Sequence, residues 1–316
     1  MPEKNATLLL HARLYDIADK LATVRARSVP AEGLFHYTNA AGLIGIVRDE
    51  AVWATDYRAL NDSQEFRIGL ECTDSVISRM KSEAPLDRHQ KWLNVLSNMI
   101  GFWRSKRFRP FVASFSEKAD QLSQWRAYSS QGAGYSLGFS SFAPNVAVIS
   151  DEGETPFPNP GLHVALLKCT YDSTKFCEVL QKDLEELLVA ADRWSDSVRD
   201  EVVAVEFATA AGRHITFSIP QLKHEAFREE EEWRLVAYPE DIPTDLVQYR
   251  VSTRGLLPYV LVRLSPHKQR LDINRLIVGP TQSDRGMAFA TEFMEQKGYK
   301  DVSVTHSRAP YSTTLY

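Results

Sequence analysis

The sequence lacks the features that would place the chain in a membrane or outside the cell. No run of apolar residues approaches the length of about 18 that a membrane-spanning helix needs. Residues 1–27 mix acidic and basic side chains in an amphipathic pattern, which excludes the apolar segment of a signal peptide. We therefore expect a cytoplasmic protein with no membrane partner.

Cysteine is also scarce, which bears on two kinds of site. The three cysteines, Cys72, Cys169 and Cys177, are an odd number and form no CxxC pair. Neither a disulfide framework nor a thiolate zinc site is supported, and we expect buried thiols.

Common nucleotide and hydrolase motifs are absent as well. The chain contains no GxxxxGK[ST], no GxGxxG at the start of a helix, no HExxH and no GxSxG. A formal net charge of −4 gives no overall attraction to nucleic acid or to an anionic membrane. Function therefore has to be argued from local patterns of polar and aromatic residues.

The apolar residues that are present follow both helix and strand periods. A first helix is predicted by apolar residues spaced by three and four positions, and it ends before Pro30. Two early strands, joined by a helix that Asn39 caps, are predicted at 34–37 and 51–55. Later strands are predicted near 233–238, 247–251, 259–264 and 274–279.

These elements do not alternate regularly, so we expect the α+β class rather than a doubly wound parallel sheet. The predicted organisation is an N-terminal helix over 1–30 and a single domain over 31–316. A helical insertion is expected around 177–211. A last helix from Asp284 is expected to end at Gly298.

His36 is the first candidate site residue. It lies between Phe35 and Tyr37 on a predicted strand, so its side chain points to the opposite face from both aromatics. It is either a ligand-binding group or a buried histidine that a backbone carbonyl satisfies.

The segment LNDSQE also has two interpretations. Asp62 followed by Glu65 is typical of a capping box at the start of a helix. The same helix N-terminus, with its free amide groups, is suited to a phosphate or a ribose.

Trp125 and Tyr128 are three positions apart and are therefore expected to share a face of a short helix. Core packing is an equally good interpretation for Trp125. Tyr128 adjoins serines and a glycine, so we expect it at a surface cleft where its ring can stack on a planar group.

The acidic run before Trp233 is the most informative segment. If it is a strand, Trp233, Leu235 and Ala237 form a buried face. The opposite face then carries two carboxylates and a guanidinium, from Glu230, Glu232 and Arg234. A solvated charge run is the alternative interpretation.

A basic and aromatic stretch extends from Trp103 to Phe111. Its arginines and lysine interleave with aromatic rings, a pattern that binds single-stranded nucleic acid. A solvated helix end is the more common meaning of such a pattern.

The order FHYT, LNDSQE, ASFS, SQWRAY, GxGYSLGF, EEEEWR and IVGP resembles a widespread bacterial family catalogued as a domain of unknown function. That family is in turn similar to ADP-ribosyltransferases of the His-Tyr-Glu class. The resemblance implies a pair of small packed sheets with flanking helices. It also implies NAD as the substrate and a role as a bacterial toxin or anti-phage defence effector.

The resemblance assigns roles to individual residues. His36 would hold a ribose of NAD, Tyr128 would stack on nicotinamide, and Glu232 or Glu230 would be catalytic. Trp125 or Tyr135 would supply a second stacking ring. Further NAD-binding residues would come from the same motifs, namely Tyr37, Thr38, Asn61 and Arg234.

The expected chemistry suits these residue types. Cleavage of the nicotinamide–ribose bond builds positive charge on the ribose, which a fixed carboxylate stabilises without a metal. We therefore expect an NAD-consuming ADP-ribosyltransferase whose macromolecular acceptor is a nucleic acid or a protein. The alternatives are a non-catalytic module that binds a nucleotide or a nucleic-acid end and, less favoured, a metal-dependent nuclease built on Asp62, Glu65 and the glutamate run.

Overall fold

The computed structural model describes residues 3–24, 29–59, 63–106, 110–140, 142, 149–150, 153–154, 162–239, 246–252, 255–264 and 270–311 of the chain. The chain divides into two compact units. The helical unit consists of Met1–Arg27, Leu60–Pro110 and Leu167–Ala226. The sheet unit consists of Ser28–Ala59, Phe111–Leu166 and Phe227–Tyr316.

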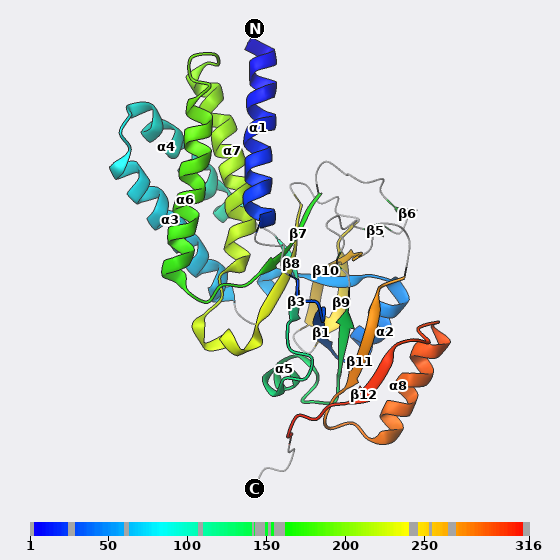
Figure 1. Cartoon of the computed structure of the whole chain (residues 1–316). Coiled ribbons are helices and arrows are strands. Elements are labelled where there is room, and N and C mark those ends of the chain that lie inside the picture. Colours follow the sequence, from blue (N-terminus) through cyan, green and yellow to red (C-terminus); the bar gives the residue numbers. More distant parts are fainter. Residues whose placement is uncertain are drawn as a thin grey trace. The chain divides into compact units, whose positions relative to one another are not determined.

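The helical unit is built from α1 (Glu3–Val24), α3 (Ser63–Glu83), α4 (Asp87–Lys106), α6 (Ser173–Asp192) and α7 (Asp200–Ser218) (Figure 1). Helix α7 contacts α1, α4 and α6. It can do so because its buried residues, among them Phe207, Ala208 and Phe217, lie on more than one side of the helix. The predicted insertion around 177–211 falls within α6 and α7. These two helices form one unit with α1 and with the 60–110 segment. The helical unit is therefore built from three separate segments of the chain, whereas the sequence predicted a single insertion.

Among the described residues, the sheet unit contains three α-helices and nearly all of the strand residues. The helices are α2 (Ala40–Asp49), α5 (Leu122–Tyr128) and α8 (Asp284–Gln296). The strands of the large sheet are β1 (Leu34–Thr38), β2 (Val52–Asp56), β3 (Phe111–Ser116), β4 (Tyr135–Phe139), β7 (Leu162–Lys168), β8 (Glu232–Pro239), β9 (Gln248–Ser252), β10 (Gly255–Val262), β11 (Ile273–Val278) and β12 (Ser303–His306). A separate pair is formed by β5 (Ile149–Ser150) and β6 (Gly153–Glu154). The α+β class is thereby confirmed.

Strand β3 pairs with three other strands of this sheet. The main strand order is β12-β11-β4-β1-β3-β2-β10-β9, and β8 pairs with β3 outside this path. One edge of β3 pairs with β8 along its length, from Phe111 to Ser116. On the other edge, Ser116 pairs with β1, whereas Val112 and Phe111 pair with β2. The edge of β3 between Val112 and Ser116 therefore faces a gap between β1 and β2, which we call the sheet split.

The register gives the sheet two different faces. On one face Phe115 and Trp233 pair across β3 and β8, and they belong to the main core with Leu34, Leu137 and Val260. The other face carries Thr55, Ser114, Ser116, Glu232 and Arg234, which the register places on one side. We call this second side the polar face.

Local signals explain where several elements begin and end. The Asn39 side chain accepts a hydrogen bond from the Gly42 amide at 2.9 Å, which confirms the predicted cap of α2. Helix α8 ends before Gly298, whose φ of 85° is the left-handed conformation expected of a glycine cap. Cys169 is buried as predicted, whereas Cys72 and Cys177 are only half-buried.

Asp120 ties the loop before α5 to the chain that follows β12. Its carboxylate accepts hydrogen bonds from Trp125 Nε1 at 2.6 Å and from Ser307 Oγ at 2.5 Å. It also accepts one from the Arg308 amide at 2.6 Å. One acidic side chain therefore holds two segments that are far apart in the sequence.

We predict that Asp120→Ala lowers the free energy of unfolding by about 2–4 kcal/mol, because it leaves three donors without their charged acceptor. Urea denaturation measures the change. Asp301→Ala, at an exposed position in the same unit, is the matched control and should alter stability by less than about 0.5 kcal/mol. Equal effects of the two substitutions would show that Asp120 is not a structural anchor.

Candidate functional site

His36 lies at the sheet split. Its Nδ1 is 2.8 Å from the backbone oxygen of Ser114, the β3 residue midway between those that pair with β1 and β2. Within the strand ladder this carbonyl has no neighbouring strand on that edge, and a buried carbonyl without a partner is costly. The imidazole supplies the missing hydrogen bond.

The protonation state of His36 follows from this geometry. A carbonyl oxygen only accepts, so Nδ1 must carry the proton. Burial is the main cause that lowers the pKa of His36 to about 4. The hydrogen bond to Ser114 raises this pKa, and the charge of Arg250 lowers it by a smaller amount. At neutral pH the ring is therefore uncharged, and its Nε2 is a bare hydrogen-bond acceptor.

Glu232 and Arg234 form an ion pair on the polar face. Arg234 Nε donates to Glu232 Oε1 at 3.0 Å, and Arg234 Nη2 approaches Glu232 Oε2 at 3.1 Å. The two side chains are 4% and 3% exposed, so the pair is shielded from water. Their strand neighbours on β3 are Ser116 and Ser114.

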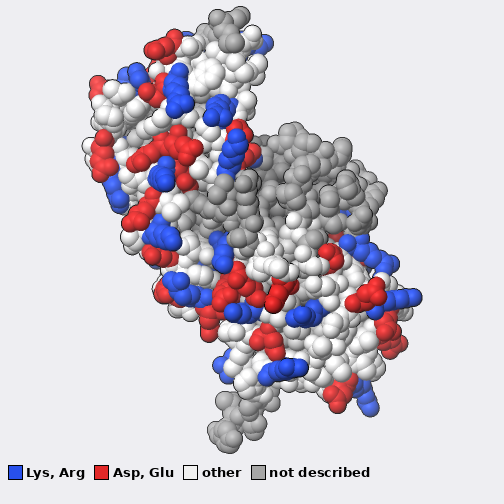
Figure 2. Space-filling view, in the orientation of Figure 1, with Lys and Arg blue, Asp and Glu red and all other residues white. Residues whose placement is uncertain are grey.

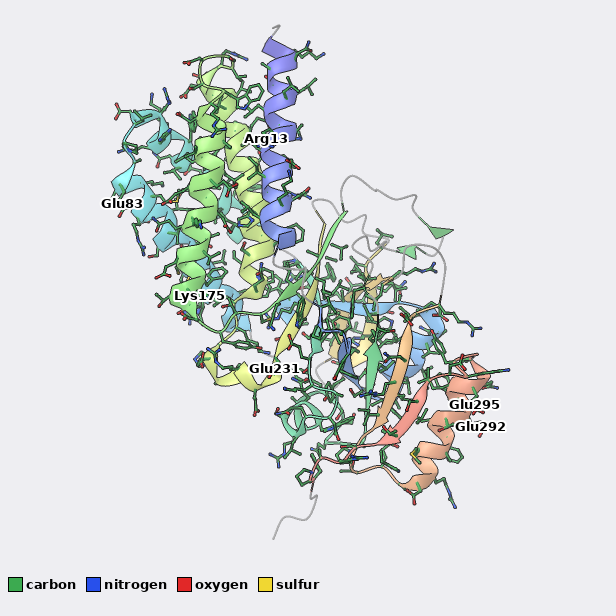
Figure 3. All side chains as sticks on the ribbon, viewed as in Figure 1. Arg13, Glu83, Lys175, Glu231, Glu292 and Glu295 are labelled. Carbon is green, nitrogen blue, oxygen red and sulfur yellow. The ribbon has the colours of Figure 1, made fainter. Side chains whose placement is uncertain are left out.

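Glu230 does not share the strand face of Glu232, contrary to the prediction from alternation. It is the last residue of a 3₁₀ helix, Glu225–Glu230, and β8 begins only at Glu232. Glu231 between them has a φ of 41°, which breaks the strand period. The turn is fixed by β3, since Ser116 Oγ donates to the Glu230 carbonyl at 2.7 Å and the Glu117 amide donates to the Glu231 carbonyl at 3.2 Å. Figure 3 labels Glu231 at this junction.

Tyr37 and Thr38 have structural contacts of their own. The Tyr37 hydroxyl donates to the Lys118 carbonyl at 2.8 Å and accepts from the Gln121 amide at 2.9 Å. Burial raises the pKa of Tyr37, which keeps the hydroxyl protonated. Thr38 is buried against the first turn of α2, where its Oγ1 leaves room only for a glycine at position 42. Both residues position β1 rather than open to a ligand.

Neither proposed second stacking ring is accessible. Trp125 is 0% exposed and packs edge-on against Tyr37, with ring centroids 4.9 Å apart. Tyr135 is 9% exposed and lies in the main core. The expectation that one of them stacks on a ligand is corrected. Trp125 is buried where it donates a hydrogen bond to Asp120, and Tyr135 is buried because β4 pairs with β1.

Tyr128 is the exposed aromatic at the end of α5. It is 36% exposed, unlike Trp125 on the same short helix. The chain then passes through three left-handed residues, Ser130, Gln131 and Gly132, and the Gly132 amide returns to the Trp125 carbonyl at 3.1 Å. This tight turn ends the helix at the tyrosine and leaves part of its ring at the surface.

The strand register does not bring all predicted residues to one face. Phe35 pairs with Ser116, which pairs with Glu232, so these three side chains share the polar face. His36 is the next residue along β1 and lies on the other face, beside Phe115, with ring centroids 5.5 Å apart. Asn61 lies outside the described residues, as does Asp62.

Sequence reasoning missed the residues that complete the polar face. Ser114 and Ser116 belong to the segment ASFS, to which the sequence analysis assigns no role in the site. Thr55 and Arg250 carry no motif, yet Arg250 Nη2 donates to Thr55 Oγ1 at 2.8 Å. Alternation along ASFS was the available signal for the serines. The partnership of Thr55 and Arg250 depends on strand pairing that no local pattern indicates.

On the face shown in Figure 2, basic and acidic side chains are interspersed. Among the residues that the structure describes, no group of three or more His, Cys, Asp or Glu side chains is arranged to hold a metal ion. In the same part of the chain, no helix has the length and apolar character to cross a membrane.

Residues 124–235 match a protein family described as "Protein of unknown function (DUF2971)". The match begins in α5, includes Tyr128, Glu230 and Glu232, and ends one residue after Arg234. It does not reach His36. A search of curated proteins and a search of solved structures gave no match.

We predict a specific pH dependence from His36. Between about pH 6.5, where an unfolded histidine titrates, and about pH 4, where His36 titrates in the fold, the unfolded state binds more protons. Stability is therefore complete above this window and falls as the pH drops through it, by at most about 3 kcal/mol. His36→Asn retains a donor for the Ser114 carbonyl but removes this titration.

Urea denaturation of both proteins at pH 7 and pH 4.5 tests the prediction. The wild type should lose more stability than His36→Asn over this interval. Equal losses would mean that His36 titrates normally and that its imidazole is not held at the sheet split.

Proposed function

We propose that the chain is an NAD-consuming ADP-ribosyltransferase that uses the sheet split as its NAD site. The observation that carries this proposal is the hydrogen bond from His36 Nδ1 to the Ser114 carbonyl. It fixes the tautomer, so that Nε2 is available to accept a hydrogen bond from a ribose hydroxyl. The carboxylate of Glu232 lies two residues along β8 from Arg234, the register partner of Ser114.

Glu232 is the proposed catalytic carboxylate. As the nicotinamide–ribose bond breaks, positive charge develops on the ribose and the electron pair leaves with nicotinamide. An ionised carboxylate on the polar face stabilises this charge, and its orientation is fixed in advance by Arg234. The positive charge of Arg234 offsets the negative charge of Glu232 and weakens its stabilisation of the ribose cation. NAD therefore has to displace part of the Glu232–Arg234 ion pair.

Tyr128 is the proposed stacking residue for the nicotinamide ring. It is the exposed member of the α5 aromatics, and a partly exposed phenol ring offers a face to a planar ligand. Cleavage of the nicotinamide–ribose bond does not define which molecule accepts the ADP-ribose. We keep a macromolecular acceptor, either nucleic acid or protein, as part of the proposal. The role of toxin or anti-phage defence effector rests on the family resemblance alone.

A non-catalytic nucleotide-binding module is the second candidate. It is favoured by the Glu232–Arg234 pair, in which both carboxylate oxygens already face the guanidinium and little of either side chain is exposed. Such a protein would bind NAD and release no nicotinamide. A metal-dependent nuclease would differ from both by losing activity on addition of a chelator.

The first test of the proposal is Glu232→Gln. We predict that nicotinamide release from NAD falls about 100-fold or more, because the neutral amide no longer stabilises the developing charge. NAD affinity should change by less than about threefold, since Gln keeps the shape of the side chain. Nicotinamide is measured by chromatography and affinity by calorimetry.

Two controls make this test decisive. Glu229→Gln, at an exposed position three residues away, should leave turnover unchanged. The melting temperature shows whether the buried Arg234 tolerates the loss of its partner charge. Unchanged turnover in both Glu232→Gln and Glu230→Gln would contradict the carboxylate assignment, and NAD binding without turnover in the wild type would favour the binding module.

The second test concerns stacking. We predict that Tyr128→Ala weakens NAD binding by about 1–3 kcal/mol and that Tyr128→Phe has a much smaller effect, because the ring face is retained. Tyr249→Ala, which removes a 62% exposed ring from β9, is the matched control. A lower melting temperature with unchanged affinity in Tyr128→Ala would identify Tyr128 as a packing residue.

A further inference from the structure

Arg250 is a half-buried cation next to the sheet split. It lies on β9, and the register through Tyr259 to Thr55 places it on the polar face. Its guanidinium carbon is 5.2 Å from the centroid of the Trp53 ring and 6.0 Å from that of Tyr259. Its Nη2 donates to Thr55 Oγ1 at 2.8 Å. Two rings and a hydroxyl thus hold the group in one orientation.

This guanidinium has no anionic partner in the part of the chain that the structure describes. Its hydrogen bond to Thr55 goes to a neutral acceptor, and its buried Nε has no hydrogen-bond partner among the described residues. Burial lowers the pKa of Arg250, and no carboxylate acts against that effect. By contrast, Arg234 on the same face is neutralised by Glu232. Partial burial of a charge without a counter-ion is costly, and a bound anion would offset this cost through charge-assisted hydrogen bonds.

The surroundings of Arg250 indicate which anion fits. Arg250 lies on the polar face, and His36 approaches the sheet split from the opposite face, where the Arg250 charge is the smallest of the three causes that set its pKa. Arg250 offers charge-assisted donors, which suit phosphate oxygens, whereas His36 Nε2 offers a bare acceptor, which suits a hydroxyl. A phosphate and a sugar hydroxyl occur side by side in a nucleotide.

We propose that Arg250 is the phosphate-binding residue of the sheet split, where it engages a phosphate oxygen of a nucleotide whose ribose hydroxyl contacts His36. The assignment deepens the proposed function, because it names the group that would hold the NAD pyrophosphate. Thr55 orients the guanidinium, and the rings of Trp53 and Tyr259 lie beside it. Binding of the anion supplies a counter-charge that none of the described residues provides.

The alternative is that Arg250 is a structural strut between Trp53 and Tyr259. The two interpretations predict opposite effects on the protein without ligand. Replacing an unpaired buried cation by an apolar residue of similar length removes a desolvation cost, so Arg250→Met should keep or raise the melting temperature. Loss of a strut would lower it, because the cation–π contacts would be lost.

Calorimetry on the full chain with NAD, inorganic pyrophosphate and adenosine tests the proposal. The wild type should bind NAD and pyrophosphate, and Arg250→Met should bind both about 10- to 100-fold more weakly. Adenosine, which has no phosphate, should bind both proteins equally. Arg275→Met is the matched control, since Arg275 also lies over a ring, that of Phe35 at 5.9 Å, but is exposed on β11. Arg250→Lys, which keeps the charge without the planar fork, should lie between wild type and Arg250→Met.

The outcomes separate this inference from the proposed enzyme activity. Pyrophosphate binding that requires Arg250, without any nicotinamide release, supports the phosphate site and overturns the enzyme. Nicotinamide release whose KM for NAD is the same in Arg250→Met overturns the phosphate site and leaves the enzyme standing. No pyrophosphate binding by the wild type, or a lower melting temperature of Arg250→Met with unchanged NAD affinity, also overturns the phosphate site.

Discussion

The hydrogen bonding along the two edges of β3 determines how the rest of the sheet unit is arranged. One edge is occupied throughout by β8, whereas β1 and β2 share the other edge at opposite ends. This arrangement leaves the Ser114 carbonyl facing a gap, and a side chain rather than a strand has to satisfy it. His36 does so, and its protonation state, its bare Nε2 and the proposed NAD site all follow from that contact.

Charge on the polar face is distributed unevenly, and this unevenness is the basis of the functional proposals. Glu232 and Arg234 neutralise each other two residues apart on β8. Arg250 is held on the same face by two rings and a hydroxyl, and none of the described residues gives it a counter-ion. A buried pair contributes little net stability compared with apolar residues, and a buried unpaired cation lowers stability. The functional proposals therefore assign both arrangements to the binding of a nucleotide.

The local elements of the fold could be predicted from the sequence because their signals are short-range. The apolar spacing in α1, the Asn39 cap, the Gly298 cap and the alternation of Trp233, Leu235 and Ala237 all operate within a few residues. The left-handed Glu231 could not be predicted, because β3 imposes it through Ser116 and Glu117. The burial of Trp125 likewise depends on Asp120 and the distant Ser307.

Site residues that depend on register were beyond sequence reasoning for the same reason. The sequence QYRVS does not indicate that Arg250 contacts Thr55, which lies almost two hundred positions earlier. The contact exists because β10 pairs with β2 on one edge and with β9 on the other. The grouping of α1 with α6 and α7 is also set by packing between distant segments. His36 was identified because an isolated histidine between two aromatics is visible in the sequence, although its partner Ser114 was not.

The state of the His36 imidazole is the most direct test of the account. Nitrogen-15 NMR of the histidine rings distinguishes a protonated Nδ1 from a protonated Nε2, and it reports a new hydrogen bond at either atom. We predict that at pH 7 His36 is neutral with the proton on Nδ1, and that addition of NAD shifts its Nε2 resonance as that atom accepts a hydroxyl hydrogen bond. A charged ring, a proton on Nε2, or an Nε2 resonance that does not respond to saturating NAD would contradict the account.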